Sequence, residues 1–126
     1  MPFVIAANGP RGLRLVAEHG AGWVTTGRDG VTGEDWWSSV GELVGRLEET
    51  ALAEGRDPAT IDRYLSLDSN GAYSLQSVDA FEDAVGRAAE LGFTDVISHW
   101  PRADGIYAGT ESVLEQVAAG MERRTA

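Results

Sequence analysis

The chain has 126 residues, 43% hydrophobic and 24% charged, a composition typical of one folded domain over residues 1–126 rather than of a disordered polypeptide. The absence of cysteine excludes disulfides, thiolate nucleophiles and cysteine-ligated metals, and the absence of lysine excludes Schiff-base catalysis. A net charge of −10 argues against a nucleic-acid partner, and no apolar run reaches the ~20 residues that a membrane span needs.

The charge is unevenly distributed along the chain. Residues 1–28 contain Arg11, Arg14 and Arg28 against Glu18 alone, a net charge of +2, so the remainder carries −12. An anionic small ligand would therefore favour the first segment. Because the sequence opens without a basic, secretory-type leader, we expect a cytoplasmic protein.

The first elements in chain order are two short strands around a helix. Residues 3–7 form a continuous apolar run, which predicts a buried strand. Pro10 suits the first turn of a helix, and Gly20 and Gly22 end the apolar pattern that follows it. Residues 23–26 predict the second strand.

A long amphipathic helix is expected next. Thr32 and Asp35 resemble a capping box at its start, with Asp in place of the usual Glu. Trp36 and Trp37 then begin an apolar spacing of three and four residues that ends at Gly55. We interpret both as core or interface residues rather than as residues that stack on a cofactor. Residues 64–67 predict a third strand, and a polar loop follows it.

The last part of the chain repeats the alternation. Ser77 is expected to cap a helix over residues 78–91, residues 94–98 predict a fourth strand, and Thr110 is expected to cap a final helix. Strands that alternate with helices indicate an α/β protein with a parallel sheet made of four βα units. Since such sheets bind ligands at the carboxyl ends of their strands, we expect the site in the loops that follow the strands.

The loop "NGPRG" is a candidate anion site. Gly9 allows a ligand to approach the backbone closely, and the following helix presents unpaired N–H groups at its start. Arg11 and Arg14 could add positive charge, and Arg11 is better placed to grip a phosphate with two hydrogen bonds. The alternative is that the loop only turns the chain and the arginines are solvated. A short glycine loop is compatible with both an anion site and a simple turn, so the sequence leaves the two alternatives open.

Histidine is the other candidate for chemistry. His99 follows the fourth strand and can donate or accept a proton near neutral pH, although a histidine that merely ends a strand is an open alternative. His19 is expected to stabilise the end of the first helix. The Thr25 hydroxyl, at the end of the second strand, could line the ligand site, but threonine is also a good strand residue, and we favour the structural interpretation. No residues have metal-ligand spacing, and the acidic side chains lie mainly on solvated helix faces.

The chain resembles the luciferase-like flavin-dependent oxidoreductases, specifically their C-terminal half. The resemblance rests on four segments in the same order, "AANGPRGLRLVAEHGAGWVTTG", "GRDPATIDR", "SVDAFEDAVGRAAELGFTDVISHWPR" and "VLEQVAA". The segments lie between residues 6 and 119, so the resemblance extends over nearly the whole chain. The resemblance implies a TIM-type (β/α)8 barrel that uses FMN or the deazaflavin coenzyme F-420 for hydride transfer or monooxygenation.

The resemblance also implies a cofactor site. The family's A-x-G-P turn cradles the cofactor phosphate through backbone amides, which here corresponds to Asn8, Gly9, Pro10 and Arg11, with Gly12 at the start of the helix.

Further segments that match the family imply the surroundings of that cofactor. Thr26 and Gly27 would lie close to the cofactor or substrate. The match at "SHWPR" places His99, as a candidate catalytic residue, with Trp100 and Arg102 at the mouth of the barrel.

The length departs from the family pattern, because a (β/α)8 barrel takes ~250 residues and eight strands. Four strands correspond to the second half of such a barrel, with open edges and an uncovered inner face. We therefore expect self-association as a homo-oligomer, or pairing with a separate first half-barrel. The functional hypotheses are an oxidoreductase or monooxygenase acting on a small molecule, a non-catalytic oligomeric binding module, and a truncated half-barrel without activity.

Overall fold

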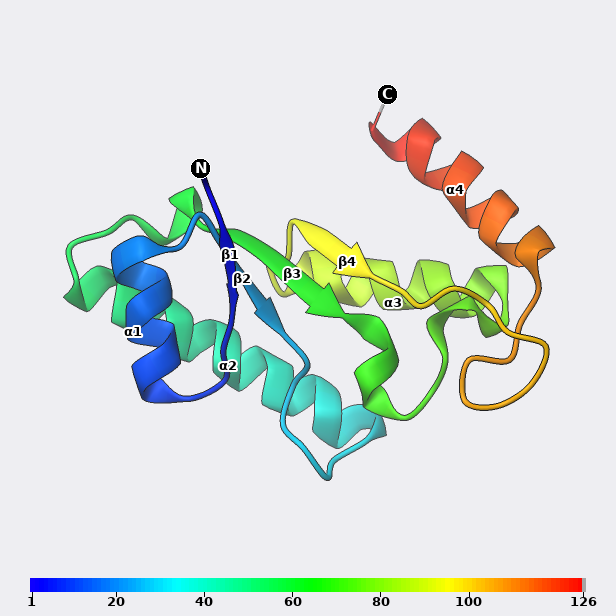
Figure 1. Ribbon diagram of the computed structural model, residues 1–126, viewed down its shortest axis with the longest axis horizontal. Helices are drawn as coiled ribbons and strands as arrows, with labels where there is room; N and C mark the ends of the chain where they lie inside the picture. The colour runs from blue at the N-terminus through cyan, green and yellow to red at the C-terminus, as the bar shows by residue number, and fades with distance from the viewer. Residues whose placement is uncertain (126) are drawn as a thin grey trace.

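The computed structural model describes residues 1–125 and consists of alternating strands and helices around one parallel sheet (Figure 1). The strands and helices are β1 (Val4–Ala6), α1 (Pro10–His19), β2 (Gly22–Thr25), α2 (Gly33–Ala53), β3 (Asp62–Ser66), α3 (Val78–Glu90), β4 (Asp95–Ile97) and α4 (Glu111–Thr125). The prediction of an α/β protein built from four βα units is confirmed. The ends of the elements lie within two residues of their predicted positions, as expected where terminal turns are defined by single hydrogen bonds.

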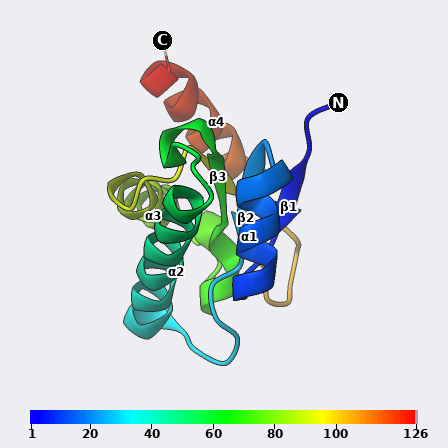
Figure 2. The same cartoon turned by 90° about the vertical axis from the view of Figure 1, so that its left-hand side faces the viewer.

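The strands lie in the order β1-β2-β3-β4, and every neighbouring pair is parallel. The register places Ile5, Trp23 and Arg63 side by side, and one residue further along it places Ala6, Val24 and Tyr64 side by side. Because neighbouring residues of a strand point to opposite faces, these two rows belong to opposite faces of the sheet. Figure 2 shows α2 and α3 together on one side of the strands.

The hydrophobic core lies between the sheet and its helices. Trp23 and Leu65 are fully buried on the helical face of the sheet, and Trp36 is fully buried on α2. The indole of Trp23 stacks on Phe93 with ring centroids 5.8 Å apart. Trp37 is also buried, so the prediction that both tryptophans of α2 belong to the core is confirmed.

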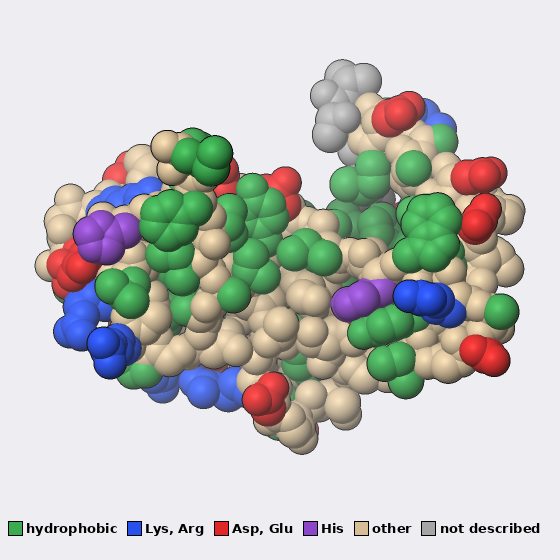
Figure 3. Space-filling view, viewed as in Figure 1, with side chains coloured by type: hydrophobic (Ala, Val, Ile, Leu, Met, Phe, Trp, Pro, Cys, Tyr) green, Lys and Arg blue, Asp and Glu red, His purple; other side chains and the backbone are tan. Residues whose placement is uncertain are grey.

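The opposite face of the sheet is not covered by any helix of the described chain. Val4 and Ile97 are 42% and 39% exposed, and Ala6 of the same face is also exposed. Val24 and Tyr64 of the same face are half-buried. Hydrophobic side chains gather over the strands in the view onto this face (Figure 3). The sheet therefore has one packed and one open apolar face.

The sequence predicts three helix caps, and the structure contains two of them. The Ser77 hydroxyl accepts a hydrogen bond from the backbone N–H of Ala80 at 3.0 Å, and the Thr110 hydroxyl accepts one from Val113 at 3.3 Å, as predicted. The expected capping box at Thr32 is wrong, because its side chain makes no capping hydrogen bond. The methyl group of Thr32 instead packs against Gly71 of the loop after β3.

The segment after β3 is more ordered than the polar loop that the sequence predicts. It contains two short 3-10 turns, Leu67–Asn70 and Ser74–Gln76, and buries Tyr73 and Leu75. The polar sequence of this segment does not predict the turns, because its apolar residues are isolated and pack against residues elsewhere in the chain. Among the helices described here, none combines the length and apolar character required to cross a membrane.

Candidate functional site

The candidate site residues lie at the carboxyl edge of the sheet, because all four strands run in the same direction. Asn8 follows β1, Thr26 and Gly27 follow β2, Asp68 follows β3 and His99 follows β4. This is the edge at which parallel α/β sheets bind ligands. The contacts at this edge form two groups, one after β1 and β2 and the other after β3 and β4.

The first group is a closed set of hydrogen bonds around Asn8. The Thr25 hydroxyl donates to Asn8 Oδ1 at 2.5 Å, and Asn8 Nδ2 donates to the carbonyl of Gly27 at 3.1 Å. The backbone N–H of Gly27 returns to the Thr25 hydroxyl at 3.1 Å. The side chain of Asn8 is thus engaged in joining two loops, and the interpretation of the buried Thr25 as a structural residue is consistent with these contacts.

The start of α1 has the features that a bound anion requires. Pro10 occupies the first helical position, as expected, and the backbone N–H groups of Arg11 and Gly12 have no acceptor within residues 1–125. A Cβ added to Gly9 would meet no atom within 4 Å, and the Arg11 side chain is exposed. Free N–H groups, open space and a cation fit the phosphate end of a flavin or deazaflavin.

Two glycines of the implied cofactor site are required by packing. A Cβ on Gly12 would lie 2.7 Å from the Cβ of Ala7, so glycine allows α1 to approach β1 closely. Gly27 has a φ of +73°, and a Cβ there would lie 2.3 Å from Nε1 of Trp36. Both residues therefore have a role in the fold that does not depend on a ligand.

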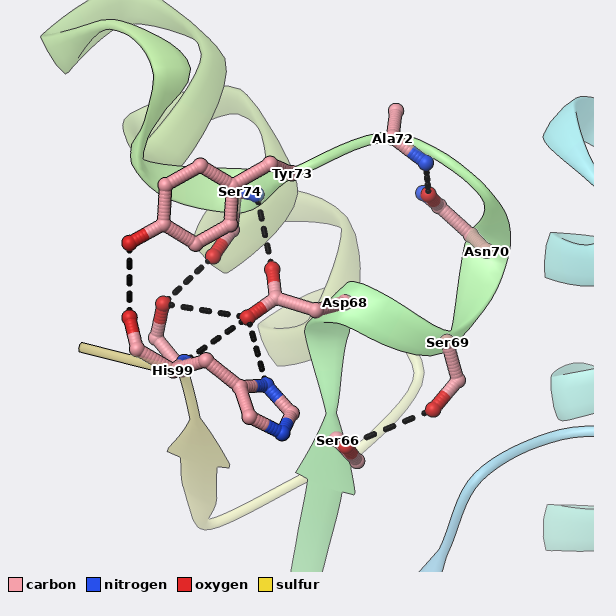
Figure 4. A network of polar contacts seen from close by, with 9 residues as sticks. Ser66, Asp68, Ser69, Asn70, Ala72, Tyr73, Ser74 and His99 are labelled. Carbon is pink, nitrogen blue, oxygen red and sulfur yellow. Dashed lines mark hydrogen bonds and ion pairs between the residues drawn. The ribbon is translucent and has the colours of Figure 1, made fainter. Parts of the chain in front are cut away.

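The second group centres on the carboxylate of Asp68 (Figure 4). Its Oδ1 accepts a hydrogen bond from the backbone N–H of Ser74 at 2.7 Å, and its Oδ2 accepts one from the backbone N–H of His99 at 2.8 Å. The Nδ1 atom of His99 lies 3.0 Å from the same Oδ2. Ser98 completes the group through its hydroxyl, 2.6 Å from that of Ser74.

These contacts set the charge of Asp68. Its side chain has no exposed surface, and burial alone would raise the pKa of the carboxyl group. The hydrogen bonds from Ser74 and His99 outweigh burial and hold the pKa of Asp68 below its ordinary value. The group is therefore an ionised, hydrogen-bonded carboxylate inside the loops at neutral pH.

Aromatic side chains hold His99 from the other side. The ring of Tyr107 stacks on the imidazole with centroids 4.0 Å apart and planes 7° apart, and the hydroxyl of Tyr73 donates to the His99 carbonyl at 2.7 Å. Burial and the charge of Asp68 raise the pKa of Tyr73, which keeps this hydroxyl protonated as a donor. Tyr107 reaches His99 because the loop after β4 folds back on itself.

That loop also carries the other two residues expected at the mouth. The backbone N–H of Arg102 donates to the Tyr107 carbonyl at 2.8 Å, and the N–H of Gly109 donates to the Arg102 carbonyl at 2.9 Å. Trp100 is 61% exposed and Arg102 is exposed. The backbone of Arg102 thus closes the loop, and both side chains are accessible at its surface.

His99 was predicted from the sequence as a site residue, whereas Asp68, Tyr73 and Tyr107 were not. Asp68 had a recognisable signal, since it follows directly on the predicted third strand of a parallel sheet, where ligand-binding side chains concentrate. No pattern in the sequence indicated the aromatic partners Tyr73 and Tyr107. Within residues 1–125, no group of three or more His, Asp and Glu side chains gathers as a metal site would.

No protein-family model and no curated protein sequence matches this chain. The resemblance to the luciferase-like oxidoreductases accordingly depends on the four segments quoted above and on nothing further.

Proposed function

We propose that the chain is the second half of a luciferase-like oxidoreductase barrel and binds the phosphate of FMN or coenzyme F-420 at the start of α1. One observation carries the proposal. The four segments of the resemblance occur in family order on successive βα units, and the loops that would contact the cofactor all follow carboxyl ends of one parallel sheet. Fold likeness alone would not support an activity, because such folds host many chemistries.

In this proposal the residues of the first loop bind the anion. The N–H groups of Arg11 and Gly12 donate to phosphate oxygens, and the guanidinium of Arg11 supplies charge. The exposed Thr26 lies beside this loop, since Asn8 bonds the adjacent Gly27. When bound, the flavin or deazaflavin would supply hydride transfer.

His99 is the candidate proton-transfer residue of the same site. Its imidazole is 43% exposed, follows β4 and is held on two sides by Asp68 and Tyr107. A positioned imidazole of this kind can take a proton from a small-molecule substrate or return one. The four strands present would need four more to enclose a substrate in a closed barrel.

Cofactor binding tests the proposal directly. A cofactor at 100 times its dissociation constant stabilises the folded protein by about 2.7 kcal/mol, so FMN or F-420 should raise the melting temperature by several degrees. Gly9→Val should abolish the shift without unfolding the protein, because a Cβ at this position has open space and an extended backbone. Arg11→Ala should weaken it, whereas Arg14→Ala, the loss of an exposed cation one turn further on, should not.

The outcome that would overturn the proposal is equally definite. If saturating FMN and saturating F-420 both leave the melting curve of the wild-type chain unchanged, the chain has no flavin-type phosphate site. A shift that survives Gly9→Val would mean that the cofactor binds elsewhere.

A second candidate function is a non-catalytic, self-associating binding module. The uncovered apolar face of the sheet favours it, because an assembly would bury Val4, Val24 and Ile97. The two candidates differ in one respect. The oxidoreductase consumes a reduced flavin or deazaflavin in the presence of an acceptor, whereas the module forms oligomers that leave it unchanged.

A further inference from the structure

The carboxylate of Asp68 and the imidazole of His99 form a polar pair in which each partner is held by further contacts. Asp68 lies in the turn after β3, and His99 lies two residues after the end of β4. The two residues are 31 positions apart in sequence, and their strands bring them together at the carboxyl edge. Figure 4 shows the carboxylate between the loop that carries Ser74 and the backbone of His99.

The contacts fix the ring as well as the backbone of His99. Asp68 Oδ2 receives the backbone N–H at 2.8 Å and faces Nδ1 at 3.0 Å, so one oxygen holds both groups. Tyr107 stacks on the ring, and Tyr73 holds the carbonyl. The ring of His99 is therefore held on two sides, while its side chain remains 43% exposed.

The chemistry of the partners determines which ring nitrogen carries the proton. An ionised carboxylate can only accept hydrogen bonds, so Nδ1 of His99 must donate to it. In a neutral imidazole with its proton on Nδ1, the lone pair is on Nε2. No other described contact engages Nε2, and the side chain is 43% exposed.

We propose that Asp68 is a positioning residue that holds His99 as the Nδ1–H tautomer, so that Nε2 accepts a proton from a molecule bound at the carboxyl edge. The proposal rests on the proposed function, in which His99 transfers a proton, and it names how the fold prepares that residue. As the bond between the proton and the substrate breaks, the proton forms a bond to Nε2, and the positive charge on the ring lies against the Asp68 carboxylate. The same nitrogen can return the proton, and no other reactant is required.

The tautomer can be observed in the wild-type chain without any ligand. Long-range ¹H–¹⁵N spectra at about pH 9, where imidazole side chains are neutral, separate the two tautomers. The chain contains only two histidines, and His99→Gln assigns the signals by loss of one set. We expect His99 as the Nδ1–H tautomer. An Nε2–H tautomer would overturn the proposal.

Chemical reactivity provides the second test. Diethyl pyrocarbonate acylates an unprotonated imidazole nitrogen, and mass spectrometry follows His99 and His19 separately. At about pH 9, where imidazole side chains are neutral, Asp68→Asn should slow acylation of His99 roughly tenfold, the factor carried by one charge-assisted hydrogen bond. His19, an exposed residue in the last turn of α1, should react at an unchanged rate in both proteins and serves as the internal control.

A matched variant separates positioning from simple support of the loop. Tyr73→Phe removes the hydrogen bond to the His99 carbonyl and leaves Asp68 in place, so the His99 rate should stay within about twofold. Equal His99 rates in wild-type and folded Asp68→Asn protein would overturn the proposal. If Asp68→Asn does not fold, the wild-type tautomer decides. Neither experiment contains a cofactor, so failure of flavin binding would overturn the proposed function and not this assignment.

Discussion

The indole of Trp36 lies directly against the α-carbon of Gly27, and its Nε1–H donates a hydrogen bond to the neighbouring carbonyl of Thr26 at 2.9 Å. This contact ties the first turn of α2 to the loop after β2. Packing against Trp36 therefore accounts for glycine at position 27, which the family resemblance assigns to the cofactor site. Core residues therefore hold this part of the carboxyl edge in place without a ligand.

Gly27→Ala should lower the free energy of unfolding by about 2–4 kcal/mol, from the left-handed backbone and the overlap with Trp36 combined. Gly30→Ala is the matched control, because Gly30 has a similar φ of +81° but open space around its Cβ. It should lose only the backbone part, about 1 kcal/mol. Urea denaturation measures both, and equal losses would rule out the steric contribution.

Gly12→Ala should destabilise the protein although alanine is the better helix former. The overlap with the Cβ of Ala7 costs about 1–3 kcal/mol, more than the ~1 kcal/mol that alanine contributes inside a helix. Gly45→Ala, at an exposed position in the middle of α2 with open space, should instead stabilise it by about 0.5–1 kcal/mol. Opposite signs in thermal denaturation are expected, and a gain for both would contradict the close contact of α1 with β1.

Asp68 should make the stability of the protein depend on pH in acid. Because its pKa is lowered in the folded state, its contribution is fully present above the unfolded value of ~3.9 and is lost as the pH falls through the folded value. Between pH 6 and about pH 2, the wild type should lose more unfolding free energy than Asp68→Asn. Glu34, whose pKa is lowered by its hydrogen bond with Arg87, contributes equally in both proteins. Parallel acid profiles would refute this role of Asp68.

The open sheet face should mediate association with a second copy of the chain. Within residues 1–125, the outer edges of β1 and β4 pair with no further strand, and two four-stranded parallel sheets supply the eight strands of a closed barrel. Sedimentation velocity should detect a dimer. Val24→Glu on the open face should dissociate it, and Leu52→Glu on α2, where the leucine is 66% exposed on the helical side, should not. A folded wild-type monomer at all concentrations would exclude this assembly.

The sequence was sufficient for the order of the elements, because their signals are local. Pro10 at the start of α1, the Ser77 cap and the apolar spacing from Trp36 along α2 each depend on neighbours a few residues away. A local sequence pattern was misleading where the residue makes a contact with a distant part of the chain instead. Thr32 has the composition of a capping box, yet its methyl group packs against Gly71 and its hydroxyl makes no cap.

The candidate site was only partly accessible from the sequence. Its location at the carboxyl ends of the strands and the residue His99 both follow from the βα alternation. The roles of individual residues do not. The resemblance implies that the backbone of Asn8 helps to hold a phosphate, and the structure adds that its side chain bonds to Thr25 and Gly27. Gly12 and Gly27 remain predicted cofactor residues, and the structure adds that steric contacts within the fold also require glycine at both positions.

The sequence by itself determined a four-unit βα protein, its buried tryptophans and the edge at which ligands would bind, since periodicity and capping act over one or two turns of chain. Only the tertiary structure decided that Asp68 and His99 meet, that Tyr107 returns to stack on the imidazole, and that one face of the sheet stays open. These relationships join residues that are distant in sequence and depend on strand register and loop closure, which no local pattern encodes.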